Sequence, residues 1–277
     1  MPTSLGLVLT QWAPEPTVMV GLALLSAGYL WLLRRPAMAV SPGRQACFWI
    51  GIATLVLALL SPLDQLSDVY LLSAHMVQHL LLTLIVAPLF VRALPASLGA
   101  RIHIHPVAAI LIFNFVFSVT HAPLWYDATL HHEALHAFEH LAYIGTAFIN
   151  WLPVLNPARE RRLPNPVAIL YLFAETLPMF LVGSILALSH AEIYTWYLRA
   201  PRLVPWTPVQ DQSVAGLVMW IGGSFFYLAA ATVVFFRWAA NEIEPDDADV
   251  GSASSTSAAS HHPASGIGAY DNGFSPS

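Results

Sequence analysis

Seven long apolar segments, separated by short polar breaks, dominate this chain of 277 residues. The hydrocarbon core of a bilayer takes roughly 20 apolar residues per helix, and the breaks carry the Pro, Asn and Asp residues typical of turns. Only 10% of the residues are charged, whereas about 25% are charged in an average soluble domain. The sequence therefore predicts an all-α, polytopic membrane protein. Its seven expected transmembrane helices lie at about 17–33, 45–61, 70–91, 105–121, 131–153, 166–188 and 212–237.

The positive charges are distributed unevenly between the two sides of such a bundle. The chain has no lysine, and nine of its eleven arginines fall in alternate connections, whereas only Arg199 and Arg202 fall on the other side. Cytoplasmic connections are enriched in arginine and lysine. The pattern therefore predicts an N-terminus outside the cytoplasm and a C-terminus inside it.

Three regions follow from this topology. Residues 1–16 form a short extracytoplasmic N-terminus without the basic stretch of a cleavable signal, and residues 17–240 form the seven-helix membrane domain. Residues 241–277 are rich in Ser, Ala, Gly and acid, which predicts a disordered cytoplasmic tail. Most of the net charge of −5 arises in that tail, so the membrane domain is near neutral and has no nucleic-acid-binding signature.

Histidines concentrate at the predicted outer ends of the third to sixth spans. These eight of the twelve histidines are His75, His79, His121, His131, His132, His136, His140 and His190. Two groups, His75/His79 and His132/His136/His140, repeat at steps of four, so each lines one face of a helix. A single histidine in a span is usually satisfied by a neighbouring polar group, but two stepped groups at similar depth favour a metal site. We expect this site at the extracytoplasmic face.

The available ligand types narrow the choice of metal. Cys47 is the only cysteine, which excludes a Cys-x-x-Cys motif, so imidazoles, thioethers and carboxylates remain. Histidine with methionine suits copper, and histidine with a carboxylate also suits zinc. The preferred ligands are His75, His79, His136 and His140, with Met76, His132 and Asp211 as further candidates. For two of these a structural role is the alternative: packing for Met76 and helix capping for Asp211.

Three more acids lie in or beside the spans. Glu133 and Glu139 share the fifth span with the histidines and are expected to accept hydrogen bonds from imidazoles. Glu175 lies near the middle of the sixth span, where a carboxyl group needs a partner. Asn114 and Asn150 are the expected partners.

Several short motifs, taken in order along the chain, resemble the CtaG family. They are His75-Met76-Val77-Gln78-His79, Ala87-Pro88-Leu89, Trp125-Tyr126-Asp127, Asn150-Trp151-Leu152-Pro153, and Asp211-Gln212 followed by Gly216 and Met219-Trp220. The family consists of seven-span bacterial membrane proteins linked to cytochrome c oxidase assembly, with copper handling as the supposed activity. The resemblance covers roughly residues 15–240. It implies a non-catalytic assembly factor of the bacterial cytoplasmic membrane, with subunits of haem-copper oxidase and a periplasmic copper donor as partners.

Two other classes of function fit the same residues. Seven spans with His-x-x-x-His and a distant Asp are compatible with an intramembrane zinc-dependent hydrolase. Histidines on facing helices are also compatible with a b-haem electron carrier.

Overall fold

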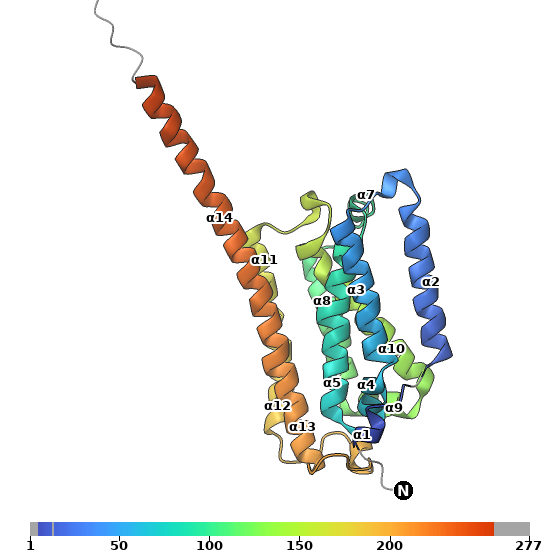
Figure 1. The fold of residues 1–277 in the computed structure, drawn as a ribbon. Coiled ribbons are helices and arrows are strands. Elements are labelled where there is room, and N and C mark those ends of the chain that lie inside the picture. The colour runs from blue at the N-terminus through green and yellow to red at the C-terminus, as the bar shows by residue number, and fades with distance from the viewer. Residues whose placement is uncertain (1–4, 13, 258–277) are drawn as a thin grey trace, which may run out of the picture. The chain divides into compact units, whose positions relative to one another are not determined.

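The computed structural model of the protein describes residues 5–12 and 14–257, with side chains to residue 242, and this part of the chain is helical without a strand (Figure 1). The chain divides into a main unit, Met1–Val234, and a second unit, Phe235–Ser277. The main unit contains every residue of the candidate site. The prediction of an all-α membrane protein is confirmed at this level.

Each predicted span coincides with a helical segment. These segments are α2 (Pro16–Leu33), α3 (Pro42–Leu59), the continuous run of α5 (Leu72–Leu80), η3 (Leu81–Val86) and α6 (Ala87–Ala93), α8 (Pro106–Thr120), α10 (Glu133–Leu155), α11 (Asn165–Ala174) with α12 (Thr176–Leu188), and α13 (Pro208–Leu217) with η6 (Val218–Gly223) and α14 (Ser224–Ser257). Short helices connect them: α1 (Leu5–Val8), η1 (Pro36–Met38), α4 (Pro62–Gln65), η2 (Leu66–Tyr70), α7 (Ala96–Gly99), α9 (Pro123–His131), η4 (Arg159–Arg161) and η5 (Trp196–Leu198).

The number of helices able to cross a membrane is smaller than seven by length and apolarity. Five segments of the described chain qualify, and α8 with α9, which are bent by 72°, make a sixth if the pair counts as one span. Helix α10 is long enough, but it carries Glu139, His140 and Asn150 within its length. These polar residues lower the apolarity of α10, so it is not among the segments that qualify as spans. The number of seven spans therefore remains a prediction.

Proline and capping residues fix where the helices begin. Helices α2, α3, α8 and α11 each have proline in the first turn, where its fixed φ suits the helix and its missing N–H costs nothing. Helix α13 begins with a capping box, in which the Thr207 hydroxyl and the Gln210 side chain satisfy each other's backbone N–H groups.

Helices α12 and α13 pack closely through glycines. A Cβ atom on Gly216 would lie 2.4 Å from the backbone nitrogen of Ala187 and 2.5 Å from the carbonyl oxygen of Gly183. Small residues allow membrane helices to approach in this way.

Replacing Gly216 by alanine is therefore expected to destabilise the protein by about 1–3 kcal/mol through overpacking. The matched control is Gly145→Ala, because a Cβ at Gly145 meets nothing within 4 Å and alanine favours the helix. Thermal unfolding in detergent should show a lower midpoint for Gly216→Ala alone. Equal midpoints for the two variants would contradict the close packing of α12 on α13.

The last described helix, α14, extends into the segment predicted to be disordered. Within the second unit, the indole N–H of Trp238 donates to the Glu242 carboxylate at 3.0 Å, one helical turn away. Residues 258–277, including His261 and His262, lie outside the described residues.

Candidate metal centre

Four histidines from two helices meet in the main unit. His75 and His79 come from α5, and His136 and His140 come from α10. Ring centroids lie 4.2 Å apart for His75 and His79, and 4.3 Å apart for His136 and His140. Between the helices, His75 is 5.6 Å from His136 and His79 is 5.7 Å from His140. The stepped spacing in the sequence therefore produces one cluster with two rings from each helix.

Six of the eight ring nitrogens of this cluster are buried and lack hydrogen-bond partners among the described residues. His75 is fully buried and His79 is 4% exposed. Within the part of the chain that the structure describes, neither nitrogen of either ring has a partner, and the Nε2 atoms of His136 and His140 also have none. The Ser67 carbonyl approaches His75 but not in hydrogen-bonding geometry.

Leaving a buried polar atom unpaired costs about 1–3 kcal/mol, so several in one place need a compensating partner. Neutral imidazole nitrogens carry lone pairs that bind metal ions. The donor set therefore fits a bound cation.

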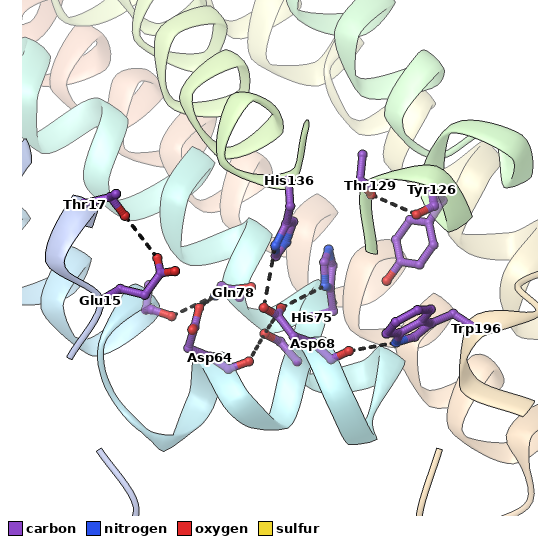
Figure 2. Close-up of polar contacts among 12 residues, drawn as sticks. Glu15, Thr17, Asp64, Asp68, His75, Gln78, Tyr126, Thr129, His136 and Trp196 are labelled. Atoms are coloured by element: carbon purple, nitrogen blue, oxygen red, sulfur yellow. Dashed lines mark hydrogen bonds and ion pairs between the residues drawn. The ribbon is translucent and has the colours of Figure 1, made fainter. Parts of the chain in front are cut away.

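Two carboxylates complete the cluster, and Figure 2 shows one of them, Asp68, beside His75 and His136. Asp68, on the π-helical turn η2, places Oδ2 3.5 Å from His136 Nδ1 and Oδ1 4.0 Å from His75 Nδ1. Glu139 on α10 is fully buried, and neither of its carboxylate oxygens has a hydrogen-bond partner in the described part of the chain. The nearby Thr129 hydroxyl donates instead to the Tyr126 carbonyl at 2.8 Å.

The donors form two groups of three. One group is Asp68, His75 and His136, and the other is His75, His79 and Glu139. In each group the ligand atoms all lie within 4.8 Å of one another, a separation that a single ion between them can bridge with small side-chain movements. His75 belongs to both groups.

A second aspartate supports the turn that carries Asp68. The Gln78 amide donates to the Asp64 carboxylate and to the Ala58 carbonyl, both at 2.8 Å. Burial raises the pKa of Asp64 to about 7, and the neighbouring charge of Asp68 adds to the increase. Partial burial likewise raises the pKa of Asp68 to about 7. A metal at Asp68 therefore competes with a proton near neutral pH.

Comparison with known proteins now adds the biological context. Residues 27–241 match the family described as cytochrome c oxidase caa3 assembly factor, Caa3_CtaG. The chain belongs to the CtaG family. No curated protein sequence and no solved structure matches the chain significantly. The complete histidine cluster lies within the matched residues.

His121 and Tyr143 form one wall of the cluster. His121 is not among the predicted ligands, but it is only 7% exposed and its ring lies 6.2 Å from that of His79. Its Nδ1 is 2.7 Å from the Phe117 carbonyl and 3.0 Å from the Tyr143 hydroxyl. The Tyr143 ring also lies 4.4 Å from the His79 ring. His121 is thus held by its own helix end and by α10.

The outer histidines lie apart from the cluster. Helix α10 begins at Glu133, so His132 precedes it and is exposed, and the expected series of three stepped histidines on this helix is reduced to two. His131 packs edge-on against Trp196 at 4.8 Å, and His190 is exposed. The prediction for His132 is wrong because a spacing of four residues places side chains on one face only within a helix, and His132 lies before the first residue of α10.

Met76 and Asp211 have structural surroundings. Met76 is fully buried within the apolar core, in agreement with the packing alternative. The Asp211 carboxylate accepts from Leu72 N at 2.7 Å, from Ser73 N at 3.2 Å and from the Ser73 hydroxyl at 2.5 Å. It therefore caps α5 from α13, a neighbouring helix instead of its own.

Asp68 was missed in the sequence, where residues 62–70 read as a break before the third span. A usable signal was present, because Ser61 followed by Pro62 is a typical helix start, and Ser61 does cap α4 by accepting from Leu63 N. A helical turn here brings Asp68 back toward His75. The indole N–H of Trp196 donates to the Asp68 carbonyl at 2.8 Å and holds this turn in place.

Glu175 belongs to a different polar group. Its Oε2 accepts from the Asn114 amide at 3.2 Å, which confirms the expected pairing with Asn114. Tyr171 donates to the Asn150 carbonyl at 3.0 Å beside it. These contacts join α8, α10 and α11 in the buried interior.

Proposed function

We propose that this CtaG-family protein binds copper in the histidine cluster at the extracytoplasmic face and assists metallation of haem-copper oxidase. Membership of this family supports a role for the protein in the assembly of cytochrome c oxidase. The observation that carries the copper proposal is the meeting of four histidines, each with at least one buried ring nitrogen that has no hydrogen-bond partner among the described residues.

The donor chemistry favours a transferable ion. Imidazole and carboxylate donors, without thiolate, exchange more readily than a closed cysteine cage, and imidazole binds copper well. We assign His75, His79, His136 and His140 as ligands, together with Asp68. Three predicted candidates are not assigned as ligands. Met76 lies in the apolar core, His132 is exposed on the surface, and Asp211 caps a helix.

Zinc hydrolysis is the second candidate, and one observation favours it. The group His75, His79 and Glu139 has the two-histidine, one-glutamate composition of several catalytic zinc sites. A b-haem is disfavoured by packing: the His75 ring lies 4.2 Å from His79 and 5.1 Å from Tyr126. These rings leave no slot between them for a porphyrin plane.

Metal analysis of protein purified without a histidine tag separates the three candidates. Cells grown with copper and zinc should yield protein that contains copper in excess over zinc, without a Soret band. Stoichiometric zinc accompanied by hydrolytic activity would support the hydrolase instead, and a Soret band would support the haem carrier.

The proposed topology has seven spans, which follow from the seven apolar segments. Its orientation, with the N-terminus outside, follows from the arginine distribution. Single cysteines at Ala122 and Glu160, both exposed positions, test it in a Cys47→Ala background. We expect an impermeant maleimide to label Ala122→Cys in intact cells and Glu160→Cys only after permeabilisation. The reverse pattern would place the histidine cluster on the cytoplasmic side.

A further inference from the structure

We propose that the cluster holds one metal ion at either of two overlapping stations and that the ion passes between them at His75. The outer station is Asp68, His75 and His136, and the inner station is His75, His79 and Glu139. This inference rests on the proposed metal binding and adds a direction of movement to it.

The shared histidine makes the stations mutually exclusive. A neutral imidazole has one nitrogen with a free lone pair, while the other carries the proton. His75 therefore serves one ion at a time, although neither of its nitrogens has a hydrogen-bond partner among the described residues. Each station offers three protein donors, which leaves coordination positions open for an incoming or departing ligand. An ion can therefore exchange between the stations without leaving His75's reach.

Exposure differs between the stations and gives the movement its direction. The Asp68 side chain is 31% exposed and that of His136 is 13% exposed. At the inner station His75 and Glu139 are fully buried and His79 is 4% exposed. The outer station is thus the one that solvent and a metal donor reach first.

A cavity of about 540 Å³ lies beside the turn that carries Asp68. Its lining includes Val69, which follows Asp68 in the chain, and Trp196, which binds the Asp68 carbonyl. The cavity gives a donor or a chelated ion space next to the outer station.

Charge at the inner station selects the kind of ion. Two neutral imidazoles and one glutamate carboxylate carry a total charge of −1, which neutralises a monovalent cation. A divalent ion would leave a net positive charge buried, which is costly in a low-dielectric environment. The charge of the inner station therefore matches Cu(I), whereas Zn²⁺ or Cu(II) needs a further anionic ligand such as hydroxide for neutrality.

The kinetics of copper exchange test the relay. Purified wild-type protein and variants are loaded with Cu(I) from a weak complex and then challenged with excess bathocuproine disulfonate, a bulky anionic chelator, in a stopped-flow instrument. Glu139→Gln removes the inner charge and should release copper at least about tenfold faster than wild type, equivalent to about 1.4 kcal/mol. Asp68→Asn should slow uptake and release by about tenfold, while the final copper content stays at the wild-type level.

An exposed carboxylate on the same helix provides the matched control. Glu133 is exposed on the helix that carries the buried Glu139. Glu133→Gln should therefore exchange copper at the wild-type rate.

Two results would contradict movement between two stations and would indicate a single site. One is release of copper from Glu139→Gln at the wild-type rate. The other is a lower final copper content in Asp68→Asn with unchanged rates of uptake and release. Failure of the wild-type protein to bind Cu(I) at all would overturn the proposed function itself. The two proposals therefore fail in distinguishable ways.

Discussion

Replacing both His75 and His79 by alanine is expected to reduce cytochrome c oxidase activity in cells to the level of a strain lacking this protein. His75 is common to both groups of ligand atoms and His79 completes the buried one, so the double variant leaves neither group intact. Oxidase transcript should remain unchanged, because the predicted defect lies in metallation, and added copper should restore activity only in part.

The matched control is His103→Ala with His132→Ala, since both histidines are exposed and lie outside the cluster. Membrane extracts should contain equal amounts of both double variants. Full oxidase activity with a stably inserted, copper-free His75/His79 variant would show that the protein assists assembly as a scaffold, without donating metal.

Replacing Asp211 by alanine is expected to cause the largest loss of stability, on the order of 3–5 kcal/mol, because it strands buried donors that were paired with a carboxylate. Those donors are the backbone nitrogens of Leu72 and Ser73 and the Ser73 hydroxyl. Thermal unfolding in detergent should show a strongly lowered midpoint. Asp211→Asn should lose less stability than Asp211→Ala, because its amide oxygen still accepts on one side while its NH2 group faces an N–H donor on the other.

Copper content, measured well below the unfolding midpoint, separates capping from ligation. Asp211→Ala should bind copper within about twofold of wild type per folded chain. Loss of copper at an unchanged midpoint would make Asp211 a ligand and would contradict its assignment as a cap.

The sequence predicts helical faces well because periodicity is a local property. The spacing of His75 with His79, and of His136 with His140, placed each pair on one face, and the structure brings the two faces together. Apolar length likewise located the helices, although α10 combines a spanning position with polar residues and so falls short of the apolarity of the five clear spans.

The sequence does not predict which helix ends contact one another in the folded protein. The Asp211 carboxylate reaches α5 across 139 positions of chain, a contact set by tertiary packing. Asp68 enters the site because residues 62–70 form a short helix and a π-helical turn, which local turn signals only suggested. Glu139 was expected beside an imidazole as a hydrogen-bond acceptor, whereas its oxygens have no hydrogen-bond partner among the described residues and one of them lies within 4.8 Å of a ring nitrogen of His75 and of His79.

Copper X-ray absorption on untagged protein, loaded with Cu(I) and freed of excess metal, tests the central claim most directly. The account predicts about one copper per chain with the scattering pattern of imidazole ligands. It also predicts that the His75→Ala/His79→Ala variant retains less than about a tenth of that copper. Equal copper in both proteins, or a spectrum dominated by sulfur, would contradict a copper site built from these histidines.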